Sequence, residues 1–336
     1  MDGRDKTGRL VTNYFLIKRL TACRISATIA AFWLTPAFFS SCDPAPAVGP
    51  AANAKQIYIQ CAKNPTPEAV DLFYFDTVGV QILDAWQRIP LVDGQPVYGL
   101  SASGVRHLSV LSAPARDTSR WMDIRTYADL CKRTLRLTDD SPEQPFLAGE
   151  TLLEDARTRE AAIVMRPLLT KISLRSVACD FRGRPYEGKP YRCHTIYLSY
   201  AGVECHPLGA GAGKPLSWIN AGWADSAAIR KLPHPQMLLQ DGCGDIGLER
   251  VPLERDFYCY AGEQLRLVLG GTLGDDECYY PIPLPNLLPG QEYRLDVTLT
   301  RKGSPDPDIP TETGAIQIDL ITVPWTREET NTIPFG

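Results

Sequence analysis

Two Cys-His pairs, Cys193-His194 and Cys205-His206, are the residues most typical of metal chemistry in this chain. Thiolate and imidazole groups are the ligands that zinc prefers in structural sites. Cys193 and His194 fall in a segment that alternates like a β-strand, where neighbouring side chains point to opposite faces, so both cannot ligate one ion without a bulge. The chain also has no Cys-x-x-Cys spacing. We therefore predict no metal site.

Other polar motifs also fall short of a site. The Gly-rich stretch 209–215 ("GAGAGKP") resembles a phosphate loop, but Leu208 stands where the first Gly belongs, and Pro215 replaces the Ser or Thr that would hold magnesium. The acidic stretches 274–277 and 306–308 lack the spacing of a dedicated calcium loop. No pattern assembles a nucleophile, a base and a residue that orients the base. We predict no cofactor and no enzymatic activity.

The cysteines are the second group that could do chemistry. Of the ten, Cys23 falls in an apparent export signal and Cys42 at its end, which leaves eight. An even number permits disulfides in an exported chain. The connectivity cannot be deduced from the sequence, but nearby predicted strands favour a Cys259–Cys278 pair. Buried free thiols are the alternative.

Residues 1–41 have the pattern of a signal peptide. A basic region at 18–24 precedes the uncharged run 25–39, which is too short for a comfortable transmembrane helix and suits a signal core. Two serines then precede Cys42, an order that resembles a lipoprotein signal and implies that Cys42 carries a lipid. Ordinary cleavage that leaves Cys42 free is the alternative. The Pro- and Ala-rich residues 42–54 are typical of a tether.

The composition is that of a globular protein with many turns. The 336 residues suggest two domains, and 44% of them are hydrophobic. A net charge of -4 excludes the basic footprint of a nucleic-acid-binding protein. Pro, with 28 residues, slightly exceeds Gly, with 26, which favours edge strands and turns over long helices.

The elements that must position these residues are mostly strands. Residues 69–89 predict a β-hairpin, and 158–179 predict two strand segments bent at Pro167. Helical spacing favours one helix over 123–137 and a short one over 225–232. Short strands with few helices predict an all-β fold of sandwich type.

We predict two tandem β-sandwiches, an N-terminal one over 55–155 and a C-terminal one over 156–336. Near the end of the chain, alternation from Tyr293 to Leu299 predicts a half-buried strand. Three prolines within 299–310 ("LTRKGSPDPDIP") must then stop the pairing, because Pro cannot donate a ladder hydrogen bond. A final strand follows. Its apolar residues occupy even positions up to Leu320 and odd positions from Ile321 on, so we expect a bulge between Leu320 and Ile321.

Several stretches together resemble the fimbrillin superfamily of Bacteroidales pilus proteins, in particular its lipid-anchored anchor or accessory members. The resemblance covers roughly residues 42–336 and is carried by "VDLFYFDTVG", "MRPLLTKISLRSV", "FYCYAGE", "CYYPIPLP", "YRLDVTLTRKGSPDPDIP" and "IDLITVPW". It implies two transthyretin-like (Greek-key) sandwich domains and surface display as a lipoprotein. It also implies polymerisation by donation of a β-strand to a groove on a neighbouring subunit, in which an unpaired sheet edge supplies the hydrogen bonds.

In shaft subunits of that superfamily an Arg-specific protease removes an N-terminal segment. Here no Arg occurs between Cys42 and Arg88. We therefore expect an uncleaved, lipid-anchored subunit of a pilus at the outer membrane, with an anchor or accessory role in cell adhesion and with other fimbrillin subunits as partners. The alternative is a surface lipoprotein that does not polymerise and binds glycan or protein ligands, with the aromatic residues of "CYYPIPLP" as a candidate surface.

Overall fold

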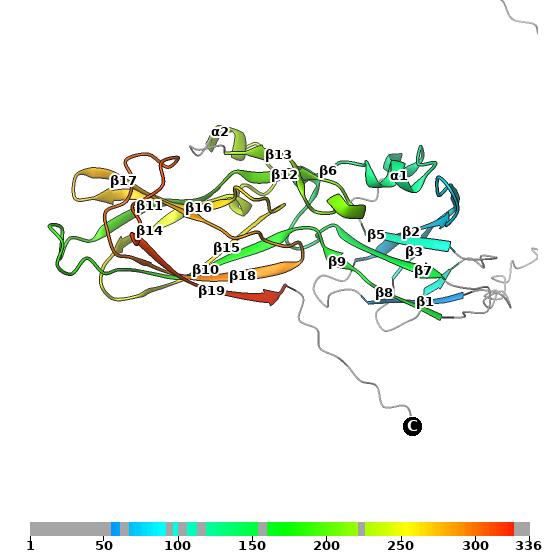
Figure 1. Cartoon of the computed structure of the whole chain (residues 1–336), viewed down its shortest axis with the longest axis horizontal. Helices are drawn as coiled ribbons and strands as arrows, with labels where there is room; N and C mark the ends of the chain where they lie inside the picture. Colours follow the sequence, from blue (N-terminus) through cyan, green and yellow to red (C-terminus); the bar gives the residue numbers. More distant parts are fainter. Residues whose placement is uncertain are drawn as a thin grey trace, which may run out of the picture. The chain divides into compact units, whose positions relative to one another are not determined.

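The structure, a computed structural model, describes residues 55–60, 67–91, 97–99, 106–112, 119–153, 160–220 and 226–325 (Figure 1). Cys42, the predicted signal and tether, and Cys61 lie outside these residues. Within them, no helix is both long and apolar enough to cross a lipid bilayer.

Nearly all regular elements are strands, which confirms the predicted all-β fold of sandwich type. The strands are β1 Lys55–Gln60, β2 Ala69–Asp76, β3 Leu83–Pro90, β4 Val97–Gly99, β5 Arg106–Ser112, β6 Leu135–Arg136, β7 Leu147–Leu153, β8 Glu160–Val164, β9 Arg166–Pro167, β10 Thr170–Cys179, β11 Tyr191–Ser199, β12 Ala201–Cys205, β13 Pro215–Ile219, β14 Leu239–Ile246, β15 Val251–Cys259, β16 Arg266–Leu273, β17 Asp276–Pro283, β18 Gln291–Leu299 and β19 Ile316–Pro324. The described helices are α1 Tyr127–Cys131 and α2 Ser226–Ile229, with 3-10 turns η1 Ser119–Trp121, η2 Leu137–Asp139, η3 Gly209–Gly211 and η4 Pro235–Met237.

The first half of the chain forms a five-stranded sheet, β3-β2-β5-β7-β9, and a three-stranded sheet, β4-β1-β8. The predicted hairpin is confirmed as β2 and β3, which pair antiparallel from Ala69↔Pro90 to Phe75↔Leu83. β2 is buried on both faces, because its two sets of alternating apolar side chains enter two clusters of the core.

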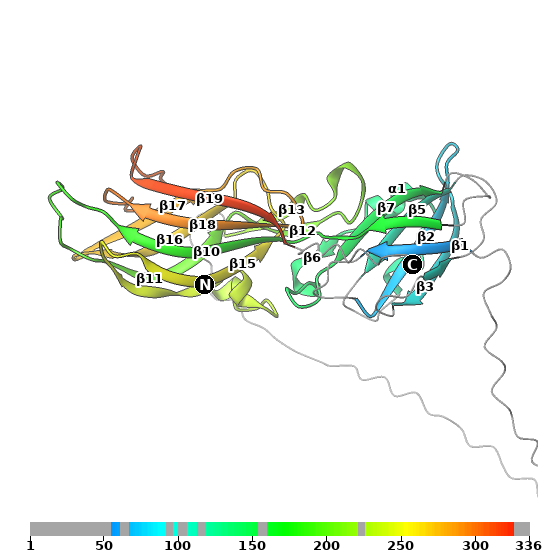
Figure 2. The same cartoon turned by 90° about the horizontal axis from the view of Figure 1, so that it is seen from below.

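The second half forms a sandwich of two four-stranded sheets, β15-β10-β18-β19 and β14-β11-β16-β17. Within the first of these, β10, β18 and β19 run side by side (Figures 1 and 2), with β10 and β18 parallel and β18 and β19 antiparallel. β18 alternates as predicted, with Tyr293, Leu295, Val297 and Leu299 buried. We refer to this pair of sheets as the C-terminal sandwich.

Strand pairs cross the position near residue 155 at which we expected a division. β6 pairs with β12, and β8 and β9 pair with β1 and β7. A buried hydrogen bond makes a further link, because the Tyr260 hydroxyl donates to Asp140 Oδ2 at 2.9 Å. The ranges 55–155 and 156–336 therefore stay predictions about domain organisation.

The predicted helix over 123–137 is much shorter in the structure. α1 begins after Thr126, which forms a capping box with Asp129, and it ends at Cys131. Leu135 and Arg136 instead form β6 and pair with Cys205 and Glu204 of β12. Pairing with β12 decides the conformation of this segment, because local helix preference is weak compared with tertiary contacts.

The bulge predicted between Leu320 and Ile321 is wrong. β18 and β19 pair without a register shift, with Leu295 opposite Leu320 and Arg294 opposite Ile321. Apolar side chains therefore lie on both faces of β19. Ile318 and Leu320 face the inside of the sandwich, and Ile321 lies on the outer face with 58% of its surface exposed.

The predicted Cys259–Cys278 disulfide stays a prediction. Both residues are buried free thiols. Cys259 ends β15 and Cys278 lies in β17, and these strands belong to different sheets. β16 and β17 form a hairpin in the sheet opposite β15.

Candidate binding groove

The C-terminal sandwich is closed along one side and open along the other. Beside β14 and β15, the turn η4 contacts both strands and buries Met237 and Leu238 in the core. At the opposite side, where β17 and β19 are the outermost strands, the inward-facing Ile318 and Leu320 remain 37% exposed. Such exposure of an inner face is unusual, since residues that face the core of a sandwich are normally covered.

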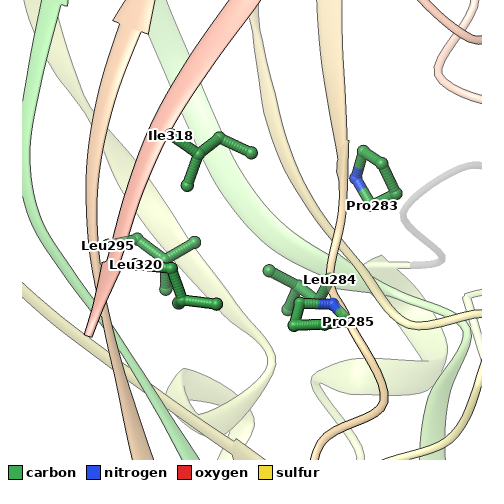
Figure 3. Close-up of a pocket in the computed structure, with 6 residues that line it drawn as sticks. All are labelled: Pro283, Leu284, Pro285, Leu295, Ile318 and Leu320. Carbon is green, nitrogen blue, oxygen red and sulfur yellow. The ribbon is translucent and has the colours of Figure 1, made fainter. Parts of the chain in front are cut away.

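This opening forms a cavity of about 480 Å³. Its lining residues are all of apolar type, namely Pro283, Leu284, Pro285, Leu295, Ile318 and Leu320, and we call them the β17–β19 groove. Figure 3 shows the two walls: the prolines and Leu284 on one side, and Leu295, Ile318 and Leu320 on the other. Leu295 is fully buried, so the groove reaches the core of the sandwich.

One wall of the groove is an edge strand. β19 pairs with β18 over nine residues, and no described strand pairs with its other side. A long apolar edge presents a row of backbone N–H and C=O groups that can pair with a further strand. The edge and the groove together can hold a strand's backbone and every second one of its side chains.

The outer face of the same sheet carries a cluster of ion pairs and hydrogen bonds. Glu292 accepts hydrogen bonds from Ser173 Oγ and Arg294, and it lies 3.5 Å from Lys171 Nζ. Burial raises the pKa of Glu292, but these donors outweigh burial and hold it below the ordinary value. This charged cluster contrasts with the apolar groove on the inner face of the same sheet.

The predicted turn 299–310 covers part of the opposite edge. Ser304 exchanges two backbone hydrogen bonds with Tyr279 of β17, at 2.7 and 2.8 Å. Gly303 approaches β17 so closely that a Cβ there would lie 2.4 Å from the Tyr279 carbonyl oxygen. The stretch thus blocks the middle of β17 and leaves the segment around Pro283–Pro285 to form the groove wall.

The two histidines and the Gly-rich stretch considered as site candidates make contacts within the fold. His206 Nδ1 lies 3.0 Å from the Arg133 carbonyl oxygen, and His194 Nε2 lies 3.4 Å from Thr272 Oγ1. No three His, Cys, Asp or Glu side chains among the described residues are placed to hold a metal ion. Stretch 209–215 is a turn between β12 and β13, with the Gly213 N–H donating to the His206 carbonyl.

The stretch "CYYPIPLP" is mostly core. Cys278, Tyr280 and Ile282 are fully buried, and the Tyr280 hydroxyl donates to the Arg301 carbonyl at 2.9 Å. Its end, Pro283–Pro285, is the part that reaches the groove. Sequence reasoning did not find the groove, although apolar residues at both parities of the last strand were a signal for it.

Comparisons with solved structures identify the fold. Neither a family model nor a characterised protein sequence matches the chain. A candidate cell-adhesion protein from Bacteroides eggerthii matches with a TM-score of 0.59 and 18% identity, over 81% of this chain and 96% of that one. A candidate cell-adhesion protein from Parabacteroides distasonis matches with 0.57 and 9% identity, over 80% and 96%. The fimbrilin FimA from Porphyromonas gingivalis matches with 0.56 and 13% identity, over 81% and 97%. The resemblance noted in the sequence thus agrees with the fold.

Proposed function

We propose that this chain, which has the fold of Bacteroidales fimbrilin and cell-adhesion proteins, is a subunit of a fimbrial assembly at the cell surface. It acts as an anchor or accessory subunit and joins a neighbouring subunit by β-strand addition. The observation that carries the proposal is the unpaired edge of β19 beside an apolar groove.

A β-strand is the occupant that fits this site best. Its backbone would pair with β19, and alternate apolar side chains would enter a cavity of about 480 Å³. Ile318 and Leu320 each have 37% of their surface left to bury. Since full burial of such a side chain contributes about 1.5–3 kcal/mol, covering this remainder contributes about 0.5–1 kcal/mol for each residue.

The position of Arg88 inside a paired strand favours an anchor or accessory role over a shaft role. It is the first Arg after Cys42, and it lies inside β3, where its guanidinium pairs with the buried carboxylate of Asp71 at 3.2 Å. Cleavage after Arg88 would cut a paired strand and discard both β1 and β2. An uncleaved chain would keep a lipid on Cys42, and we propose this lipid as the attachment to the outer membrane.

We propose no catalytic activity, because the groove contains no titratable side chain. The alternative of a glycan-binding lipoprotein has less support. Tyr280 of the aromatic stretch is fully buried, and its hydroxyl is used inside the fold. Stacking on a sugar requires an exposed aromatic face, and of the aromatic residues in this stretch only Tyr279 is partly exposed.

The test compares two lysine variants on opposite faces of one strand. Ile318→Lys puts a charge into the groove, whereas Ile321→Lys puts the same charge on the outer face of β19. Each variant is expressed in the host bacterium, and its co-purification with sheared surface fimbriae is measured beside the melting temperature of the purified chain. We expect Ile318→Lys to lose most of the co-purification and Ile321→Lys to retain it.

Equal retention by both folded variants would remove the groove from the proposal. Absence of the unaltered chain from every fimbrial fraction, with binding on a glycan array, would favour the non-polymerising alternative. Cys42→Ala tests the anchor separately: we expect release from the outer-membrane fraction, and a variant that still fractionates with the membrane contradicts lipid attachment at Cys42.

A further inference from the structure

Two cysteines of the C-terminal sandwich meet across a strand pair. Cys193 of β11 is opposite Gly244 of β14, and the next paired residues are Thr195 and Asp241. One β11 residue therefore faces two residues of β14, Gly242 and Cys243, which is the count of a β-bulge. The two thiols lie close enough to shift each other's pKa, and the Cys193 thiol also donates to the Thr195 carbonyl oxygen, with Sγ and O 3.6 Å apart.

The bulge depends on a close backbone approach at Gly242. A Cβ at this position would lie 2.1 Å from the Cys193 carbonyl oxygen. Cys193 is paired with Gly244, so Cys243 lies on the neighbouring strand one residue away from the position opposite Cys193. The strand pairing and the bulge thus bring the two cysteines close together across adjacent strands.

The two thiols differ in access and in acidity. Cys193 is 2% exposed, whereas Cys243 is only partly buried. Interaction with Cys193 lowers the pKa of Cys243, with a smaller contribution from Arg255 of β15, and the same interaction raises the pKa of Cys193. A partly exposed thiol with a lowered pKa is the type that reacts first with an external disulfide.

We propose that Cys193 and Cys243 form a redox-active pair that is oxidised by thiol–disulfide exchange with an external disulfide. The Cys243 thiolate attacks one sulfur of that disulfide and expels the other as a thiolate. Cys193 loses its proton and attacks Cys243 Sγ, which expels the second external thiolate. Two protein thiols are oxidised to one disulfide, and one external disulfide is reduced to two thiols.

Two further thiols could compete. Cys179 at the end of β10 and Cys278 in β17 lie near enough to interact electrostatically. Cys179 also interacts electrostatically with Cys243. The Cys278 sulfur, however, accepts the Gly303 N–H at 3.1 Å, and burial raises the pKa of Cys179 to about 12. Both are buried, so Cys243 is the point of entry for an external disulfide.

The test uses the full chain, reduced and then incubated folded with oxidised glutathione at pH 7.5. Free thiols are alkylated, and the products are identified by intact mass and peptide mapping. We expect loss of two hydrogens and a single linkage, Cys193–Cys243, together with a higher urea midpoint than the reduced chain. The Cys259→Ser variant, which removes a buried thiol of β15, should give the same linkage.

The single-cysteine variants separate the two steps. Cys193→Ser should accumulate a stable glutathione adduct on Cys243, because the resolving thiol is gone. Cys243→Ser should form neither the adduct nor the linkage at this site. A folded chain that stays fully reduced, or that links Cys179 with Cys243 or with Cys278, would overturn the proposal.

Discussion

Replacement of Asp140 by Asn should change how the stability of the fold depends on pH. Asp140 is 1% exposed, and its Oδ1 accepts the N–H groups of Ser141 and Phe146 at 2.9 and 3.0 Å. Its Oδ2 accepts the Tyr260 hydroxyl at 2.9 Å. Three donors favour the ionised carboxylate, but burial outweighs them and raises the pKa of Asp140 from 3.8 to about 7.

The sign and size of the effect follow from proton linkage. Between pH 3.8 and about 7 the folded state binds a proton that the unfolded state has released. The free energy of unfolding therefore falls as the pH rises through this window. At about 1.4 kcal/mol per pH unit, the full loss is about 4 kcal/mol, of which about 2.5 kcal/mol falls between pH 5 and pH 8.

Asn fits the same site without a charge. Its oxygen can keep both backbone donors, and its amide can donate to the Tyr260 oxygen. We expect Asp140→Asn to be close to wild type at pH 5 and more stable by about 2.5 kcal/mol at pH 8, since it carries no group that titrates there. Urea denaturation of both chains at pH 5, 6, 7 and 8 measures this, and the difference between them cancels other titrating groups. A difference that changes by less than about 0.5 kcal/mol across the series would refute the reasoning.

Three further substitutions test the packing around the groove and the first half of the fold. Leu295→Ala should cost about 2–5 kcal/mol in urea denaturation, because Leu295 is fully buried and its loss leaves a cavity; a cost below 1 kcal/mol would mean that the groove collapses onto the site. Gly303→Ala should cost about 1–3 kcal/mol, since the new methyl group meets the Tyr279 carbonyl, and an unchanged midpoint would contradict the close approach. Thr126→Ala should cost about 1 kcal/mol through loss of the α1 cap, with Thr126→Ser as the control that retains the hydroxyl and the stability.

Local pattern was enough to predict the strands whose environment is simple. β2 is apolar at both parities and is buried on both faces, and β18 alternates because only one of its faces meets the core. The prediction of a helix over 123–137 is wrong because pairing with a distant strand, and not the local pattern, decides the structure of this segment. Leu135 has helical spacing from Cys131, but its backbone pairs with Cys205 in a strand that follows about 70 residues later.

The groove and the thiol pair could not be predicted because both depend on strand order and register. β19 is an edge only because β18 inserts between β10 and β19, and the sequence does not reveal that order. Apolar residues at both parities of β19 predict a bulge, whereas in the structure they reflect an inner face on the groove and an exposed outer Ile321. Likewise, Cys243 reaches Cys193 through a register shift between β11 and β14.

The most direct test of strand addition at β19 is photocrosslinking in the host cell. A photoreactive amino acid is placed at Leu320, in the groove, and in a control chain at Leu248, which is 61% exposed and lies outside the groove. We predict that the Leu320 probe captures a terminal or edge strand of a second fimbrial subunit, identified by mass spectrometry of the linked peptide. Recovery of the same background from both positions, or of no subunit from the Leu320 probe in assembled fimbriae, would contradict the proposed function.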